Sequence, residues 1–235
     1  MVVTTHQPIF LPWPGFFYKA LCADALVLLD GLQFPKGRGW MHRNRVKSAQ
    51  GDHWLRVPVW RTGRGIQLIA DVDICDAREW RARHLRSLRE LYAHAPYVQA
   101  HLPALEEIYG RSHRSLLAFN VDLIRYLWGA LGMSGALHLQ SELEVQGSGT
   151  DLIANVCQAM KAETYLALTV SEKYLDRQKL RDGKLDLTLV RFQPPVYPQL
   201  WGPFRHNLST VDLLLNCGPR ARDFIARDRG RQQTP

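Results

Sequence analysis

One histidine stands where catalytic groups are common in α/β proteins. His6 directly follows the short apolar run 2–5, and the carboxyl ends of parallel strands are where ligands bind in open α/β sheets. A neutral imidazole can take a proton from an amine or a hydroxyl near pH 7. We therefore predict that His6 is a general base. The alternative is a structural histidine bonded to a main-chain carbonyl.

Two further residues are candidates for catalysis. Asp30 follows the second apolar run, where it can orient His6, accept a substrate ammonium or hold a metal ion. His84 is four residues from both Trp80 and Leu88, so it shares the apolar face of a predicted helix, and a core role is its alternative. No short-spaced ligand motif joins these three residues, so we predict neither a metal nor a cofactor.

Cationic, amide and aromatic side chains crowd the first quarter of the chain. Residues 1–64 hold nine Lys and Arg against three Asp, so +6 of the net charge of +8 falls there. Such a surplus indicates an anionic partner, namely a phosphate, a nucleotide or RNA, and a solvated basic face is the alternative. The predicted ligand-binding residues are Gln7, Trp13, Lys19, Gln33, Lys36, Trp40, Arg43, Asn44 and Lys47.

Four members of that set are predicted to form an anion clamp: Lys19, Lys36, Arg43 and Lys47. Arginine offers a planar fork to phosphate and lysine a mobile point charge. The indole of Trp40 offers a stacking face to a base or a sugar.

The sequence lacks the signature motifs of several protein classes. The chain has no G-x-S-x-G elbow, no G-x-G-x-x-G fingerprint and no Walker phosphate loop. Its four cysteines form no C-x-x-C pair, which indicates reduced thiols, and we expect Cys217 to be a buried structural thiol. No stretch approaches the roughly 20 apolar residues of a membrane helix, and no export signal opens the chain. We expect a cytoplasmic protein without a membrane partner, and the sequence leaves its oligomeric state open.

The elements that must position these residues follow from apolar periodicity. Apolar runs at 2–5 and 25–29, with a helix-compatible segment at 15–23 between them, predict a right-handed parallel crossover. Further strands are expected at 53–60, 66–74 and 185–192. Helices are expected at 76–92 capped by Asp76, at 116–131, at 152–162 capped by Asp151, and at 210–216 ended by Gly218.

These elements predict an α/β fold with a Rossmann-like parallel sheet core, in a HUP/nucleotidylyltransferase-like layout, and a mainly helical C-terminal half. No repeat or linker divides the chain, so one domain over 1–235 is expected, with a flexible polar tail at about 227–235.

Longer strings of residues resemble a known family. They are the run from His6 to Phe17 (HQPIFLPWPGFF), Gln33-Phe34, Trp40-x-x-Arg43-Asn44, Trp54–Pro58, Ala95-Pro96-Tyr97, Tyr174–Asp176, Leu208–Leu213 and Asn216-x-Gly218. Together they closely resemble the WbqC-like family over almost the whole chain. Members of that family occur among bacterial genes for O-antigen and other surface polysaccharides, and some among natural-product genes. The resemblance implies transfer of acyl or aminoacyl groups to amino groups.

One segment departs from the family pattern. Between Tyr165 and Tyr174 the resemblance leads us to expect a Gly-rich turn, but the chain has LALTVSEK there, which implies a different choice of substrate. A looser likeness, of layout only, is to nucleotidylyltransferases and class I synthetases. In those proteins a His-containing loop after the first strand meets a helix N-terminus that binds phosphate, and an acidic residue follows the next strand. Their second histidine is missing here, because Pro8 and Ile9 follow Gln7.

The leading hypothesis is a transferase that joins an activated acyl or aminoacyl group, aminoacyl-tRNA being one candidate donor, to an amino group of a small acceptor. His6 would be its base with Asp30 in support, and polysaccharide or natural-product biosynthesis its setting. A phosphate-bearing small-molecule donor or acceptor, or tRNA, is the expected partner. The alternatives are a non-catalytic module that binds a phosphorylated sugar or RNA, and a nucleotidylyltransferase-like enzyme.

Overall fold

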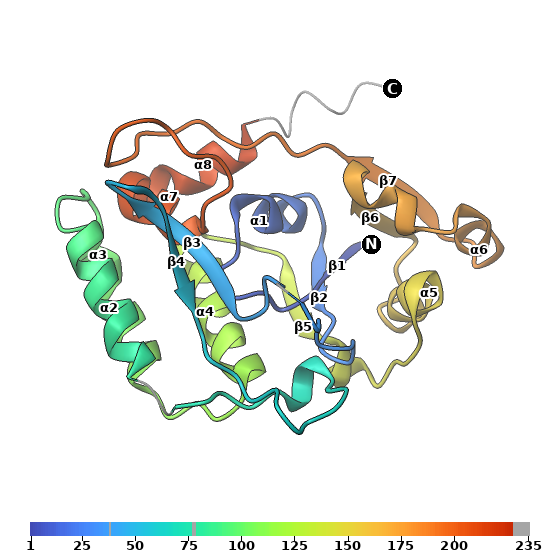
Figure 1. Ribbon diagram of the computed structural model, residues 1–235. Helices are drawn as coiled ribbons and strands as arrows, with labels where there is room; N and C mark the ends of the chain where they lie inside the picture. Colours follow the sequence, from blue (N-terminus) through green and yellow to red (C-terminus); the bar gives the residue numbers. More distant parts are fainter. Residues whose placement is uncertain (38, 77–78, 228–235) are drawn as a thin grey trace.

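A parallel five-stranded sheet forms the centre of the molecule (Figure 1). The computed structural model describes residues 1–37, 39–76 and 79–227. The strands of the sheet are β1 Val2–His6, β2 Ala25–Leu28, β5 Ala136–Leu139, β6 Thr164–Leu168 and β7 Asp186–Val190. Their order is β5-β2-β1-β6-β7, and every neighbouring pair is parallel. From β1 the chain first adds β2 and β5 on one side and then β6 and β7 on the other. Ligands bind such sheets at the point where the strand order reverses.

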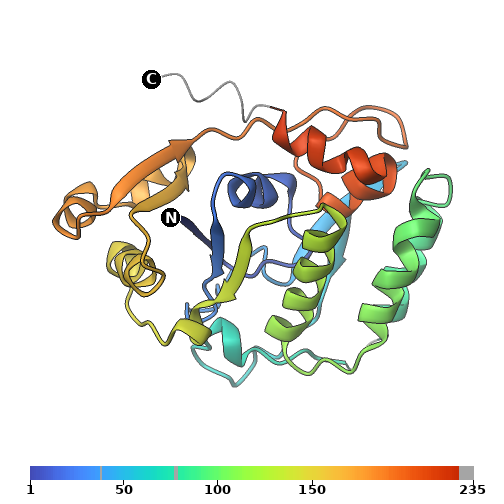
Figure 2. The ribbon, with the colours of Figure 1, turned by 180° about the vertical axis from the view of Figure 1, so that it is seen from behind.

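Helices cover both faces of this sheet. The α-helices of the described residues are α1 Pro14–Leu21, α2 Trp80–Leu91, α3 Val98–Gly110, α4 Leu116–Ala130, α5 Gly149–Ala159, α6 Arg177–Asp182, α7 Thr210–Cys217 and α8 Ala221–Ala226. Side chains alternate along β2: Leu26 packs into the core that contains α1 and α4, whereas Val27 packs into the core that contains α5. Figures 1 and 2 show α2 and α3 at one end of the molecule and α5 and α6 at the other. None of the helices in the described part of the chain is long and apolar enough to cross a membrane.

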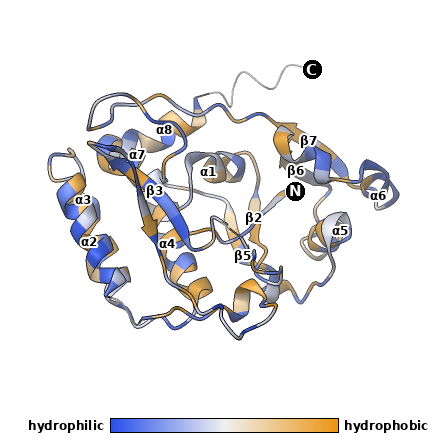
Figure 3. Ribbon diagram, viewed as in Figure 1, coloured by the Kyte–Doolittle hydropathy of each residue, from blue (hydrophilic) through white to orange (hydrophobic). Residues whose placement is uncertain are grey.

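A two-stranded hairpin packs beside the sheet. It consists of β3 Arg43–Ser48 and β4 Gly51–Arg56, which run antiparallel. Its inner face buries Val46 and Leu55 in the same core as α1. The other face is polar, and β3 is mostly coloured hydrophilic where β2 is hydrophobic (Figure 3). The hairpin therefore presents charged side chains on one face and core residues on the other.

A long segment without regular structure returns from β7 to α7, and we call residues 191–209 the strap. It passes the end of the hairpin (Figure 1). The Tyr197 hydroxyl donates to the Asp212 carboxylate at 2.8 Å, and the Trp201 indole donates to the Leu91 carbonyl at 2.7 Å. These contacts hold the strap against the helices.

Most of the predicted elements are confirmed, and one strand is wrong. The first strand–helix–strand unit, the helices at 116–131 and 210–216 and the last strand are present. The predicted strand at 66–74 is instead a 3-10 turn, η1 Ile69–Asp71, with isolated bridges on either side. Ile66 is 69% exposed, so the apolar residues there do not share one buried face. Three other 3-10 turns are η2 Gln140–Leu143, η3 Thr169–Tyr174 and η4 Gly218–Arg220.

The C-terminal half holds more strand than expected. Three of the five sheet strands come from this half, and two of them, β5 and β6, were not expected. Two predicted helix caps also lie elsewhere: Glu79 precedes α2, and Ser148 precedes α5, which leaves Asp151 in the first turn. Residues 77–78 of the predicted helix at 76–92 and residues 228–235 of the predicted tail lie outside the described residues.

Candidate functional site

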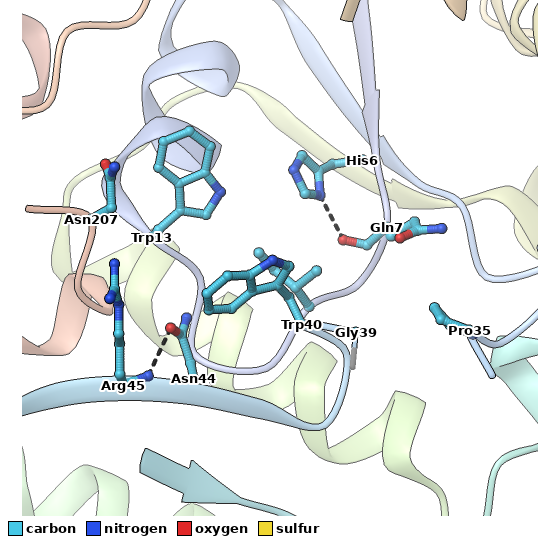
Figure 4. Close-up of a pocket in the computed structure, with 10 residues that line it drawn as sticks. His6, Gln7, Trp13, Pro35, Gly39, Trp40, Asn44, Arg45 and Asn207 are labelled. Carbon is cyan, nitrogen blue, oxygen red and sulfur yellow. Dashed lines mark hydrogen bonds between the residues drawn. The ribbon is translucent and has the colours of Figure 1, made fainter. Parts of the chain in front are cut away.

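A cavity of about 470 Å³ opens at the carboxyl end of β1 (Figure 4). The residues that line it are His6, Gln7, Ile9, Trp13, Pro35, Gly39, Trp40, Asn44, Arg45 and Asn207. They come from the end of β1, the loop after it, the segment before β3, β3 itself and the strap. The structure therefore brings together five of the predicted site residues, at the edge of the sheet where its strand order reverses.

The hydrogen bond of the His6 ring decides which nitrogen carries its proton. Nδ1 lies 2.8 Å from the carbonyl oxygen of Gln7, which can only accept, so Nδ1 donates. Burial, together with the positive charge of Lys19, lowers the pKa of His6 to about 3, although the bond to Gln7 acts in the opposite sense. His6 is thus neutral near pH 7, and its Nε2 carries the lone pair.

Lys19 lies beneath β1 instead of at the surface. It is 7% exposed, and its Nζ donates to the carbonyl of Thr5. Burial lowers its pKa to about 7. Lys19 was predicted as part of the anion clamp, but it does not line the cavity, because α1 turns this side chain toward the sheet. The fold does bring its charge close to His6.

Two indoles form apolar walls of the cavity. Trp13 immediately precedes α1, and its ring meets the edge of Phe192 with centroids 5.1 Å apart. A Cβ on Gly15 would lie 2.3 Å from the Trp13 ring, so glycine at this position makes room for the indole. Trp40 is 47% exposed and stacks on Trp54, with centroids 5.7 Å apart. The cavity can therefore cover the flat faces of a sugar, an acyl chain or a base.

Asn44 holds the loop that forms the cavity floor. Its Nδ2 donates to the carbonyls of Leu11 and Phe10 at 2.7 and 3.3 Å, and its Oδ1 accepts from the main chain of Arg45 at 2.8 Å. Leu11 has φ of 43°, a backbone conformation that needs such support. Both polar ends of Asn44 are thus used on the protein itself.

Arg45 and Asn207 provide polar groups that the sequence analysis missed. The Arg45 guanidinium pairs with Asp52 and also donates to the carbonyl of His206 at 3.3 Å. The main chain of Ser209 donates to the carbonyl of Arg45 at 2.9 Å, which joins the strap to β3 and brings Asn207 to the cavity. A signal for Arg45 was available, because residues two apart in a strand share a face and Arg43 had been predicted as a binding residue. Nothing local in the sequence marks Asn207, Ile9, Pro35 or Gly39.

Asp30 lies at the end of β2 but is bonded away from His6. Its carboxylate is 1% exposed and accepts from the main chain of Ser141 at 3.0 Å and from the Ser141 hydroxyl at 2.6 Å. These bonds tie the end of β2 to η2. The structure does not place Asp30 among the residues that line the cavity with His6.

His84 lies in the helical core. The main-chain N–H of Arg56 donates to its Nε2 at 3.0 Å, so Nδ1 carries the proton and donates to the Tyr109 hydroxyl at 3.2 Å. The side chain is 6% exposed, and burial lowers its pKa to about 3. Both ring nitrogens are engaged, which favours the structural alternative over the predicted catalytic role.

The other members of the predicted clamp are spread over three places. Lys47 is 1% exposed, and its Nζ donates to the Gly202 carbonyl of the strap at 3.3 Å. Lys36 and Gln33 line a smaller hollow of about 180 Å³, which shares Pro35 with the main cavity. The Arg43 guanidinium lies 4.7 Å from the Trp54 ring, on the outer face of the hairpin. These four cations therefore do not form one clamp.

Cys217 is buried at the end of α7. Burial raises the pKa of Cys217 to about 11, which agrees with a structural thiol. Within the ranges that the structure describes, no three His, Cys, Asp or Glu side chains gather as metal ligands would.

Comparisons with known proteins agree on one family. The model of the WbqC-like protein family matches residues 7–224. A relative from Mycobacterium tuberculosis, named Uncharacterized protein Rv1507c, is 31% identical over 225 residues, which is 95% of this chain and 96% of the relative. No solved structure matches the chain. The match of both the family model and a relative over nearly the full length shows that the chain belongs to the WbqC-like protein family.

Proposed function

We propose that this protein is a transferase that joins an activated acyl or aminoacyl group to the amino group of a small acceptor. The observation that carries the proposal is the neutral His6, whose Nδ1 is occupied by Gln7 and whose ring lines the cavity at the end of β1. A base held in one tautomer beside a binding cavity is what deprotonation of an amine needs. The Rossmann-like layout, with a histidine after the first strand, supports a site at this edge.

The proposed step forms one bond and breaks one. The acceptor nitrogen attacks the carbonyl carbon of the donor and forms an amide. The proton that the nitrogen loses goes to Nε2 of His6, and the bond from the carbonyl carbon to the leaving oxygen or sulfur breaks. The same proton then passes from His6 to the leaving group, so the ring ends neutral, as it began.

Burial makes the His6 ring a weak base, and a bound anionic ligand would make it a stronger one. A negative charge beside the imidazole favours its protonated form and raises its pKa. A donor that carries phosphate would bring such a charge, as would the developing negative charge on the carbonyl oxygen. Asp30 has no part in this scheme because its carboxylate is bonded to Ser141.

The walls of the cavity suit the two substrates. Trp13 and Trp40 can cover a sugar ring or an acyl chain, while Arg45 and Asn207 offer polar groups from β3 and the strap. An amino sugar in polysaccharide or natural-product biosynthesis fits this class of acceptor, in the cytoplasm where activated donors are made. Nucleotide-linked donors, acyl-coenzyme A and aminoacyl-tRNA are the donors to test.

Mass spectrometry of the purified chain with pooled substrates tests the proposal. The pool contains nucleotide-linked amino sugars, acyl-coenzyme A and aminoacyl-tRNAs, and the His6→Ala variant is the control. We expect an acceptor to gain the mass of one acyl or aminoacyl group with the wild-type chain alone. Donors that bind without any product would instead support a non-catalytic binding module. Release of pyrophosphate that requires Mg²⁺ would support nucleotidyl transfer.

A further inference from the structure

The outer face of the hairpin carries aromatic and cationic side chains next to one another. Trp40 and Trp54 stack with ring planes 27° apart, and the Arg43 guanidinium lies over Trp54. Arg43 is directly opposite Arg56 across the two strands, and Arg45 is opposite Trp54. Directly opposed residues of an antiparallel pair project from the same face. The Arg43–Arg56 pair therefore lies next to the Arg45–Trp54 pair along this surface.

Three guanidinium groups gather at the far end of this face. Burial, together with the charges of Arg61, Arg56 and Arg43, lowers the pKa of His42 to about 4. The Arg61 guanidinium lies 4.7 Å from the Phe34 ring and donates to the Lys36 carbonyl at 2.8 Å. Three positive charges thus surround a neutral histidine.

The acids near this face are engaged with other cations. Asp52 pairs with Arg45, and Asp73 pairs with Arg64 and Arg114. Among the described residues, neither Arg56 nor Arg61 has an ion pair with a carboxylate. Like charges directly opposite each other destabilise a hairpin. A bound polyanion would relieve this repulsion.

We propose that this face binds single-stranded RNA. The surface, which we call the tryptophan–arginine track, consists of Trp40, Trp54, Arg43, Arg56 and Arg61. Bases stack at the exposed end of the Trp40–Trp54 stack, whose indoles are 47% and 43% exposed, and phosphates pair with the guanidinium groups. Stacking on aromatic faces beside cations is how proteins hold single strands, whose bases are free of pairing partners.

The track leads to the cavity, because Trp40 belongs to both. An RNA strand on the hairpin would therefore end beside His6. The choice of RNA over DNA rests on the proposed function, since an RNA end carries the 2′-hydroxyl and 3′-hydroxyl pair that forms aminoacyl esters. RNA binding can be measured without turnover, so the two proposals can fail separately.

Fluorescence anisotropy with a labelled 12-residue single-stranded RNA and the full chain tests the track. The variants are Trp54→Ala and the double variant Arg56→Gln/Arg61→Gln, and the matched control is Arg181→Gln on α6 at the opposite end of the molecule. We expect Trp54→Ala to weaken binding by about 5-fold to about 100-fold, the range found for base–aromatic stacking. The double variant should reduce the slope of log affinity against log salt by about 1.4, since each phosphate contact contributes roughly 0.7. Arg181→Gln should bind as the wild type does.

Several results would overturn the track. The first is that the wild type does not bind RNA, and the second is that Arg181→Gln loses as much affinity as the track variants. The third is that DNA of the same sequence binds as tightly as RNA. The fourth is that AMP displaces the RNA when both are at the same concentration. Thermal melting of each variant separates loss of binding from loss of folding. His6 is not part of the track, so we expect His6→Ala to retain RNA binding. A variant that loses turnover but still binds RNA would concern the proposed reaction and not the track.

Discussion

The Nδ1–H of His6 donates to the main-chain carbonyl of its neighbour Gln7 across 2.8 Å. The bond joins two consecutive residues at the end of β1, so it holds the ring at a fixed angle to the strand that carries it. It also reserves Nε2 as the proton acceptor, because the buried ring stays neutral. This main-chain bond is the one that the structural alternative requires. It also leaves Nε2 as the atom that accepts the proton in the proposed reaction.

Replacement of His6 should remove turnover and leave the fold intact. We expect His6→Ala to lower kcat by about 100-fold to about 10,000-fold, the range for loss of a general base. The exposed His94, replaced by Ala, is the matched control and should keep wild-type rates. Steady-state kinetics with the substrate pair from the mass-spectrometric screen measures both. A His6→Ala rate close to that of the wild type would remove His6 from the mechanism.

Gly15 should control the position of Trp13. An added Cβ would lie 2.3 Å from the indole, so Gly15→Ala must displace the ring from the cavity wall. We expect a higher KM with little change in stability, since alanine favours a helix over glycine by about 1 kcal/mol. Gly129→Ala is the matched control, because a Cβ on this helical glycine meets nothing within 4 Å. An unchanged KM in Gly15→Ala would show that Trp13 does not contact the substrate.

His84 should matter for stability and not for turnover. His84→Leu leaves the Arg56 N–H without its acceptor and the Tyr109 hydroxyl without its donor. A buried polar group left unsatisfied costs about 1–3 kcal/mol, so urea unfolding should show a loss of at least that size. Turnover per folded molecule should stay normal. A large fall in kcat at unchanged stability would restore the catalytic prediction for His84.

The protein should lose stability as the pH falls below about 6.5. The folded pKa values of His6, His42 and His84 are about 3, about 4 and about 3, against an ordinary value of 6.5. The unfolded chain therefore binds more protons than the folded chain between these limits, so the contribution of each ring is complete above pH 6.5 and is lost as the pH falls toward the folded pKa. Each ring should add up to about 1.4 kcal/mol per pH unit to the slope. Urea unfolding at pH 7, 6 and 5 measures the slope, which His84→Gln should reduce by roughly one third. A flat profile would contradict these shifts.

The strap should depend on a buried carboxylate. Asp212 is 0% exposed and accepts from the hydroxyls of Tyr92 and Tyr197, of which Tyr197 belongs to the strap. We expect Tyr197→Phe to increase hydrogen exchange in the strap and to raise KM, because Asn207 would be held less firmly at the cavity. Tyr174→Phe, at a side chain 73% exposed, is the control. Unchanged exchange in Tyr197→Phe would show that the other contacts of the strap hold it without the Tyr197 hydroxyl.

Local periodicity predicted part of the fold and missed part for a clear reason. The run at 25–29 and the helix at 116–131 have strong apolar patterns, and both are present. β5 and β6 were not expected, although they have four and five residues, as β2 and β1 do. A short buried strand cannot be told from a buried helical turn by periodicity alone. Pairing with β2 and β1, which are far away in the chain, decides that these segments are strands.

The sequence by itself determined that His6 lies at the end of the first strand, that indoles and amides crowd the segment after it, and that the chain resembles the WbqC-like family. Each of these depends on residue type and on neighbours within a few positions. Only the tertiary structure decided which polar groups meet. It bonded Asp30 to Ser141, turned Lys19 toward the sheet and brought Asn207, from the far end of the chain, to the cavity that His6 lines. The physical reason is that helices and strands determine which way side chains point, whereas packing of distant elements determines what each side chain meets.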